Sequence, residues 1–212
     1  MDIHATYDVL FRLFRPARLR TFYRLFEITE NSRILDLGGT LYWWKLAEEM
    51  GLPLPQVTIV NLSPPPAGLP PHVRWIRADA CALPYRAGSF DVVFSNSLIE
   101  HLHDLDGQAR FAAEVRRVAA RWWVQTVDFR CPVEPHYLAP MIHWLPLDVR
   151  GRVLRWCTLW GWMERPTPKC CDEAAREIRI LHLQELRQLF PGSRIVFERF
   201  LALPKSIIAV QI

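Results

Sequence analysis

Short apolar runs alternate with helical patterns along most of the chain. Four runs rich in Leu, Ile, Val and Phe end near residues 37, 62, 76 and 96, and each is too short for a helix. Residues 41–50 and 106–119 instead repeat their apolar side chains every three or four positions, as one face of a helix does. This alternation predicts an α/β fold with a mostly parallel sheet.

The remaining patterns extend this prediction to both ends of the chain. Residues 1–28 predict two short helices that are separated at Pro16 and cap a cleft ahead of the sheet. The proline cluster within residues 62–71 predicts a loop. A fifth strand, a last helix and a closing antiparallel pair of strands are expected at residues 121–128, 183–190, 194–203 and 205–212.

Length and composition favour one domain. A chain of 212 residues with 50% hydrophobic content can bury one α/β core and leaves no clear room for a second. We expect a single domain over 1–212, with a helical cap at 1–30 and an insertion at 130–179. No apolar run reaches the length of a membrane span, because arginines at 150, 152 and 155 interrupt the longest candidate.

Charge and cysteine content narrow the function classes. The formal net charge is only +4 and no dense Lys or Arg tract occurs, so no nucleic-acid partner is expected. The five cysteines form an odd set without a CxxC pair, and no secretory leader precedes them. We therefore expect reduced thiols in a cytoplasmic protein, with no disulfide framework and no metal site.

A glycine turn follows the first predicted strand. Gly38 and Gly39 stand between that strand and a helical pattern, where glycine permits positive φ and a close approach to the backbone. The first amides of the following helix lack internal partners and suit an anionic or polar ligand. Asp36, Asn61 and Asp79 lie at or just after the ends of neighbouring predicted strands, so we expect them to converge on one crevice.

Three stretches of the chain carry a resemblance to a known family. They are LDLGGT at 35–40, DACALPYRAGSFDVVFSNSLIEHL at 79–102 and, more loosely, VEPHYLAPMIHWLP at 133–146. The chain resembles class I S-adenosylmethionine-dependent methyltransferases, specifically the small bacterial type related to ubiquinone and menaquinone biosynthesis methyltransferases. The resemblance implies a Rossmann-like, doubly wound, seven-stranded and mostly parallel sheet with an antiparallel last strand. It also implies S-adenosyl-L-methionine as the cofactor.

The same resemblance implies roles for particular residues in cofactor binding. It places the first glycine loop beside the methionine part of the cofactor, the second strand end at the ribose and the third strand end at the adenine. The fourth strand end lines the methionine end near the transferable methyl. The implied cofactor-binding residues are Asp36, Gly38, Gly39, Asn61, Leu62, Asp79, Ala80, Ser95 and Asn96.

Two positions depart from the family pattern. The family loop runs G-x-G-x-G, whereas the loop that contains Gly38 and Gly39 is shorter and loses a glycine. Asn61 stands where the family has an acid that grips the ribose hydroxyls. An amide gives up the charge-assisted bonds of a carboxylate, so we expect weakened cofactor binding.

The chemistry of such a cofactor sets what the protein must add. A sulfonium already activates its methyl group, so the protein must align a nucleophile and exclude water. A general base is needed only for an acceptor that carries a proton at neutral pH. The candidate catalytic residues are His101, His136 and Tyr137; for His101 a role in fixing its turn is favoured, and for the other two both roles stay open.

Four acids also have structural interpretations. Asp36 could simply cap the glycine turn. Asp79 could simply hold its loop through local backbone bonds, but its family context favours cofactor binding. Asp91 is interpreted as structural. Asp128, near the end of the fifth predicted strand, fits either contact with the acceptor or a loop cap.

The insertion at 130–179 is rich in tryptophan. In the family the matching region shapes the acceptor pocket, and here it contains Trp144, Trp156, Trp160 and Trp162. These rings could line a pocket, but packing onto the sheet is favoured because their spacing is helical. Trp and Arg also interleave over 150–162 as in helices on a membrane surface, so peripheral membrane contact stays an alternative. A homodimer that buries the aromatic insertion is another.

The function expected from the sequence is methyl transfer to a small-molecule or lipid-like acceptor. One alternative keeps the fold but assigns a macromolecular substrate, which salt-sensitive RNA binding would favour. Another is a non-catalytic binding module, in which the short glycine loop and Asn61 mark the decay of catalysis. The sequence leaves the acceptor atom and the oligomeric state open.

Overall fold

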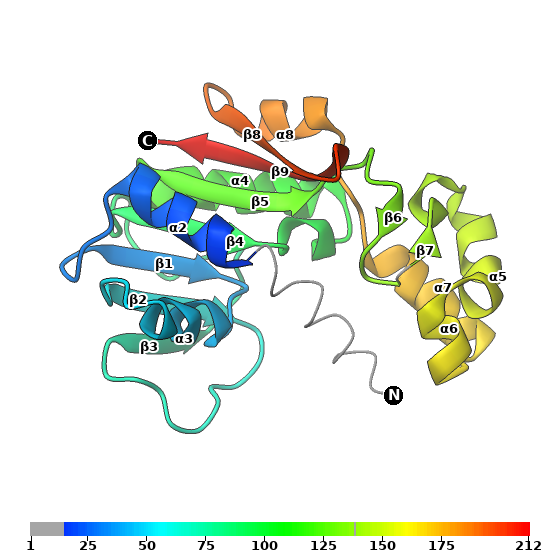
Figure 1. The fold of residues 1–212 in the computed structure, drawn as a ribbon, viewed down its shortest axis with the longest axis horizontal. Helices are drawn as coiled ribbons and strands as arrows, with labels where there is room; N and C mark the ends of the chain where they lie inside the picture. The colour runs from blue at the N-terminus through cyan, green and yellow to red at the C-terminus, as the bar shows by residue number, and fades with distance from the viewer. Residues whose placement is uncertain (1–14, 138) are drawn as a thin grey trace.

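A seven-stranded sheet organises the computed structural model, which describes residues 15–137 and 139–212 (Figure 1). Its strand order is β3-β2-β1-β4-β5-β9-β8. The strands are β1 (Arg33–Leu37), β2 (Gln56–Asn61), β3 (Val73–Arg77), β4 (Val92–Asn96), β5 (Trp122–Val127), β8 (Arg194–Phe200) and β9 (Leu203–Gln211).

The strand directions confirm the predicted sheet. The ladders β3-β2-β1-β4-β5 are all parallel, whereas β9 runs antiparallel between β5 and β8. Strand β5, between β4 and β9, is buried along its whole length, as a strand covered on both faces is. Because the parallel strands end at one edge, the residues that follow β1 to β4 lie along that edge.

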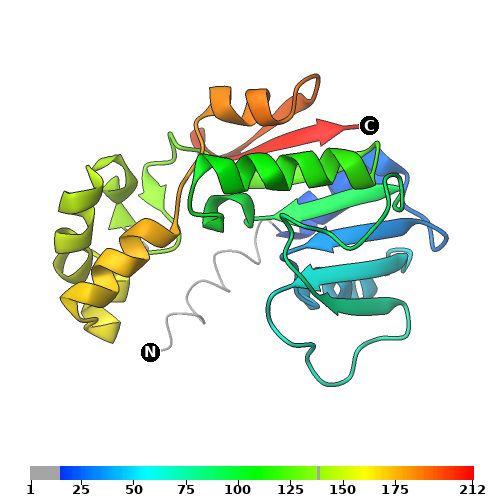
Figure 2. The same ribbon diagram turned by 180° about the vertical axis from the view of Figure 1, so that it is seen from behind.

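Helices cover both faces of the sheet (Figures 1 and 2). One face packs against α2 (Arg15–Phe26) and α3 (Tyr42–Glu49), where Phe22, Trp44 and Phe94 share a fully buried cluster. The opposite face packs against α4 (Leu105–Val118) and α8 (Leu183–Leu189). The Asp104 side chain caps α4 by accepting from the amide of Gly107 at 2.7 Å.

The described residues contain the second of the two predicted N-terminal helices. Helix α2 begins at Arg15, so the proline occupies its first turn, where a missing N–H costs nothing. The helix expected before Pro16 lies outside the described residues. The other predicted elements match observed ones within about two residues.

The insertion forms a separate lobe beside the sheet (Figure 1). It contains a two-stranded sheet of β6 (Val133–Glu134) and β7 (Ala139–Pro140), followed by η2 (Ile142–Trp144), α5 (Leu147–Cys157), α6 (Leu159–Glu164) and α7 (Pro168–Glu177). The lobe has a hydrophobic cluster of its own, built around Tyr137, Leu154 and Ala175. No helix in residues 15–137 and 139–212 is long and apolar enough to cross a membrane.

Candidate active site

The glycine turn is built so tightly that its two positions exclude side chains. Gly38 has φ +72° and donates its amide to the carbonyl of Val60 at 2.8 Å. A Cβ at Gly39 would lie 2.0 Å from Oδ2 of Asp36. The turn therefore packs directly onto the Asp36 carboxyl group, and glycine at these positions serves the protein's own packing.

Asp36 is a fully buried carboxyl group in β1. Its Oδ2 accepts from the indole N–H of Trp44 at 2.9 Å, whereas Oδ1 has no hydrogen-bond partner within the described part of the chain. Burial raises its pKa to about 7, and the bond from Trp44 only partly opposes this rise. The side chain can thus change its charge near neutral pH, directly beneath the glycine turn.

In the parent protein the free energy of unfolding should fall as pH rises, and Asp36→Asn should abolish this fall. Because the folded-state pKa lies above the unfolded one, the stabilising contribution is complete at low pH and is lost as pH approaches 7. From pH 5 to pH 8 the parent should lose about 3 kcal/mol more unfolding free energy than Asp36→Asn. Urea unfolding at both pH values measures the difference, and parallel pH dependence of the two proteins would contradict the buried charge.

Asn61 braces the glycine turn from the end of β2. Its Nδ2 donates to the carbonyl of Gly39 at 3.0 Å and to that of Gly38 at 3.4 Å. Its Oδ1 accepts from the amide of Ser63 at 3.0 Å. The amide that replaces the family's acid therefore holds backbone on both sides, which a carboxylate could not do towards carbonyl oxygens. The adjacent Leu62 side chain is exposed.

The other implied cofactor residues divide into exposed and buried ones. Asp79 is exposed after β3, and its Oδ1 accepts from the amide of Cys81 at 2.8 Å, while Ala80 is buried. Ser95 is fully buried and donates to the carbonyl of Leu37 at 3.2 Å, so it ties β4 to β1. The neighbouring Asn96 side chain instead lines a cavity.

That cavity, of about 590 Å³, lies between the sheet edge and the insertion. Its walls come from α2, the turn after Gly39, the ends of β4 and β5, the start of β9 and the beginning of the insertion. Among the described lining residues there are three basic side chains and no carboxylate. The lining residues are Arg15, Arg18, Thr40, Tyr42, Trp43, Asn96, Ser97, Gln125, Val127, Cys131, Pro135, His136, Lys205 and Ser206.

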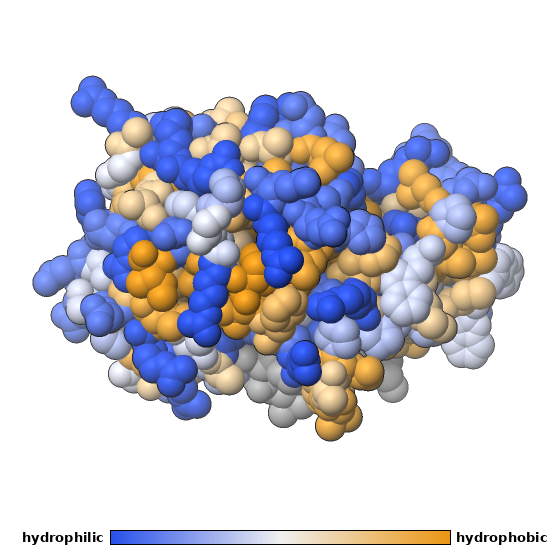
Figure 3. All heavy atoms as spheres, turned by 90° about the horizontal axis from the view of Figure 1, so that it is seen from above, coloured by the Kyte–Doolittle hydropathy of each residue, from blue (hydrophilic) through white to orange (hydrophobic). Residues whose placement is uncertain are grey.

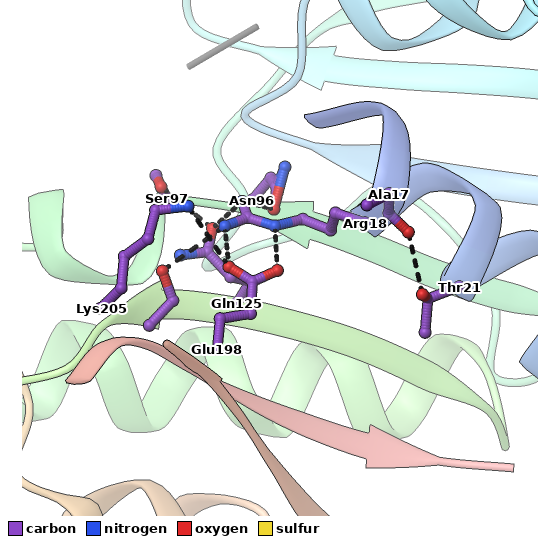
Figure 4. A network of polar contacts seen from close by, with 9 residues as sticks. Ala17, Arg18, Thr21, Asn96, Ser97, Gln125, Glu198 and Lys205 are labelled. Carbon is purple, nitrogen blue, oxygen red and sulfur yellow. Dashed lines mark hydrogen bonds and ion pairs between the residues drawn. The ribbon is translucent and has the colours of Figure 1, made fainter. Parts of the chain in front are cut away.

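Arg18 forms the centre of a polar network on one wall of the cavity (Figure 4). Its Nε donates to Oε1 of Glu198 at 2.7 Å, and its Nη2 pairs with the other oxygen of that carboxylate. Its Nη1 donates at 3.0 Å both to Oδ1 of Asn96 and to Oε1 of Gln125. A single guanidinium therefore joins α2 to the ends of β4, β5 and β8.

Lys205 shares the Glu198 carboxylate with Arg18. Its Nζ lies 3.6 Å from Oε2 of Glu198. Burial and the charge of Arg18 lower the pKa of Lys205, Glu198 opposes both effects, and the resulting pKa is about 8. The wall between α2 and β9 is thus electrostatically positive.

His136 lies on the insertion side of the cavity and is oriented by a buried acid. Its Nδ1 lies 2.5 Å from Oε1 of Glu134, whose side chain is only 1% exposed. The second Glu134 oxygen accepts from the amide of Tyr137 at 2.9 Å. Burial opposes the charged form of His136, but the bond and the charges of Glu134, Glu100 and Glu177 outweigh it, so the pKa of His136 is raised.

The structure separates the three candidate bases. His101 packs edge-on against His136 with ring centroids 4.9 Å apart, and burial together with the His136 charge lowers its pKa to about 4. Tyr137 turns away from the cavity, because its hydroxyl donates to the carbonyl of Ala174 at 2.5 Å inside the insertion. Of the three, only His136 belongs to the cavity wall.

The structural interpretations of Asp91 and Asp128 agree with their contacts. Asp91 accepts from the backbone amide of Arg33 at 2.8 Å and pairs with the Arg33 guanidinium. Asp128 is buried and accepts from the amide and side chain of Arg130. Neither acid lines the cavity.

Several residues at the cavity escaped the sequence analysis. Arg18 lies four residues before the buried Phe22 and so on the same face of α2. A cation on the apolar face of a helix is the sequence signal that could have identified it. Gln125 interrupts an otherwise apolar strand, and Glu134 precedes His136 by two residues. Glu198 gives no signal of its own, since its partner lies 180 residues away.

Comparisons with known proteins agree with this architecture. Residues 35–121 match the family model of a methyltransferase domain. No curated protein matches the chain.

Three solved structures illustrate the likeness of fold. The 1,6-didemethyltoxoflavin-N1-methyltransferase of Burkholderia thailandensis, with 1,6-didemethyltoxoflavin and S-adenosylhomocysteine bound, is 15% identical with a TM-score of 0.57, over 98% of this chain and 82% of that one. The N-terminal domain of EvdMO1 with S-adenosylhomocysteine is 18% identical with a TM-score of 0.52, over 93% and 80%. Phosphoethanolamine N-methyltransferase 2 of Haemonchus contortus with S-adenosyl-L-methionine is 16% identical with a TM-score of 0.53, over 84% and 37%.

The sheet, the glycine turn and these likenesses define a class I methyltransferase fold. The matched segment contains the glycine turn, the end of β1 and all of β2 to β4, so it covers the implied cofactor residues. The solved structures show the likeness of fold, and this segment carries the match to a methyltransferase domain. The comparisons do not show a relation to the ubiquinone type, for which the sequence motifs are the basis.

Proposed function

We propose that this protein transfers a methyl group from S-adenosyl-L-methionine to a small-molecule or lipid-like acceptor held in the cavity beside the insertion. The observation that carries the proposal is the position of His136. It lies in the wall of a cavity that also borders the turn after Gly39 and the end of β4. Its backing by the buried Glu134 is typical of an imidazole that accepts a proton.

The residues along the sheet edge fit the proposed cofactor. Asp79, Asn61, the glycine turn and Asn96 follow four strands that are neighbours in the order β3-β2-β1-β4. A row of this kind suits an extended ligand with adenine at one end and an amino acid at the other. When bound, the cofactor supplies an electrophilic methyl group, and the protein's own residues orient the acceptor and remove its proton.

His136 would act on acceptors that lose a proton on methylation. In the neutral ring one nitrogen accepts and the other donates, and Glu134 fixes which one through its contact with Nδ1. The Nε2 atom is then the one that receives the proton. Tyr42 and Trp43 close the opposite side of the same cavity with apolar surface, which suits a flat or greasy acceptor.

Three further assignments belong to the proposal. The motifs at 35–40, 79–102 and 133–146 favour the small bacterial type related to ubiquinone and menaquinone biosynthesis enzymes. The chain would act as a single domain whose insertion selects the acceptor. Five unpaired cysteines suit the reducing cytoplasm.

Calorimetry and turnover test the proposal together. We expect S-adenosyl-L-methionine and its demethylated product to bind, and a panel of phenolic, amine and lipid-like acceptors to yield a methylated product. Binding of neither compound would instead favour a non-catalytic module, in which the bonds from Asn61 to the glycine turn have replaced contacts to ribose.

Asp79→Ala should weaken cofactor affinity by about tenfold to a hundredfold. The proposal gives this carboxylate a charge-assisted bond to the adenine amino group, and such bonds contribute about 1.5–3 kcal/mol. Because Asp79 also accepts from the amide of Cys81, Asp79→Asn serves as a second variant that keeps an oxygen for that bond. Calorimetric titration of both variants measures the loss.

Asp91→Asn is the matched control for Asp79. It also removes one carboxylate charge near a strand, but its partner is Arg33 at the opposite end of β1. We expect an unchanged dissociation constant and a small loss of stability. Equal cofactor affinity in Asp79→Ala, Asp79→Asn and the parent protein would refute the assignment of the adenine contact.

A further inference from the structure

The outward face of the α5–α6 corner is apolar although it faces solvent. Trp156 and Trp162 have 72% and 76% of their surface exposed, and Leu159 between them has 38%. The inward side of the same helices is occupied by Leu154 and Gly161, both buried. We call Trp156, Leu159, Trp162 and the half-buried Met163 the α5–α6 face.

Trp160 differs from the exposed tryptophans because its ring packs against the insertion. Its ring is half-buried against the insertion's own cluster, with its centroid 5.8 Å from that of Tyr137. Trp160 therefore packs within the insertion and not onto the sheet as predicted, whereas Trp156 and Trp162 are exposed. Large exposed aromatic groups are uncommon on a surface that contacts only water.

Basic side chains surround this face. Arg152 lies one helical turn before Trp156 on the exposed side of α5, and Arg165 is exposed just after α6. The guanidinium of Arg155 lies over the Trp156 ring, 5.1 Å from its centroid. Exposed acids also lie nearby: Asp148 and Glu164 are on the same two helices, and the carboxyl group of Asp172 on α7 lies against α5 at Gly151. Figure 3 shows hydrophobic and pale side chains at the surface of this lobe, set apart from the main body by an indentation.

We propose that the α5–α6 face docks on an anionic lipid bilayer. Tryptophan suits the boundary between headgroups and acyl chains, because its ring is apolar while its N–H can bond to a headgroup. Arginines beside it gain from the negative surface potential of anionic lipids. The complementary charge favours this occupant over a second copy of the chain, which would present the same arginines.

Docking would bring the insertion, which also contributes to the wall of the acceptor cavity, to the membrane surface. The insertion that carries the α5–α6 face also carries His136 and Pro135 in the cavity wall. A lipid-like acceptor could then enter without crossing water. The docking itself goes beyond the proposed function and needs neither cofactor binding nor turnover.

Flotation with vesicles tests the docking directly. The full chain is mixed with vesicles of phosphatidylcholine alone or of phosphatidylcholine with phosphatidylglycerol. We expect flotation with the anionic vesicles, and its decline as salt concentration rises. The double substitution Trp156→Ser with Trp162→Ser should reduce vesicle partitioning by about tenfold or more, since two indole rings lose their contact with the bilayer.

Leu201→Ser is the matched control. This side chain is apolar and 81% exposed, but it lies in the turn between β8 and β9 and belongs to neither α5 nor α6. We expect its partitioning to equal that of the parent. Arg152→Gln should weaken binding to the anionic vesicles and leave binding to phosphatidylcholine vesicles unchanged.

Each of the following results would contradict docking of the α5–α6 face on a bilayer. Absence of flotation in the parent protein would overturn the proposal, as would equal partitioning of the double Trp variant. A dimer in sedimentation velocity that the double Trp variant converts to monomer would assign the face to a second copy. Cofactor affinity, measured in parallel, should not change in any of these variants, so a failure of the proposed function is distinguishable from a failure of docking.

Discussion

His136→Ala is expected to lower kcat by about 10²- to 10⁴-fold for an acceptor that must lose a proton, which is the usual contribution of a positioned general base. Cofactor affinity should stay within about twofold, because His136 lies on the insertion side of the cavity and away from the sheet edge. Single-turnover kinetics with saturating cofactor measure the chemical step. An unchanged kcat would show that the acceptor arrives deprotonated or that another group removes the proton.

Glu134→Gln separates orientation from simple structural support. The base must be neutral, so activity should rise with pH through the pKa of His136, which Glu134 helps to raise. Replacing the carboxylate by an amide removes the largest of these charges, while Glu100, Glu177 and the neighbouring His101 remain. We expect the acid limb of the pH profile to move to lower pH, in addition to a lower kcat at the plateau.

The direction of that displacement is the decisive readout. If Glu134 only supported the local structure, Glu134→Gln would reduce kcat or expression without shifting the acid limb of the pH profile. Glu134→Asp, which keeps the charge, should retain a limb near that of the parent. A limb that stays fixed in Glu134→Gln would exclude Glu134 as the positioning residue.

Arg18→Met should cost about 3–5 kcal/mol of unfolding free energy. The substitution keeps an apolar stem of similar length but removes every donor that Glu198, Asn96 and Gln125 share. A carboxylate that loses its partner in a largely buried position is the usual cause of losses of this size. Urea denaturation at neutral pH measures the change in midpoint and slope.

A double substitution distinguishes the buried charge from the lost packing. Arg18→Met combined with Glu198→Gln removes both charges, so it should recover part of the stability that the single substitution loses. Lys205 shares the Glu198 carboxylate and limits the recovery. A double variant no more stable than Arg18→Met would show that packing, and not the unpaired carboxylate, causes the loss.

The sheet followed from sequence because its signals are local. Short β-branched runs, a glycine pair and the apolar repeat of an amphipathic helix each reveal their structure within a few residues. The antiparallel last strand came from the family resemblance, and the strand order came from the structure, since no local pattern states which strands pair.

The site was harder to predict because its contacts join distant segments. His136 was a candidate from its place in the chain, but only the fold shows that Tyr137, one residue later, points into another core. The network of Arg18 depends on Glu198, which becomes its neighbour only when β8 joins the sheet. Sequence also treated Asn61 as a weakened ribose contact, whereas its amide binds the carbonyls of the glycine turn.

The separate hydrophobic cluster of the insertion has a consequence for how such proteins diversify. Because Leu154, Cys171 and Ala175 belong to a cluster that meets the sheet at Val127, the last residue of β5, we expect substitutions there to leave the other strands undisturbed. Selection can therefore rebuild the acceptor-facing lobe while the half of the chain around the glycine turn is inherited unchanged. Chimaeras that exchange residues 130–179 between relatives are the natural means of moving substrate preference from one scaffold to another.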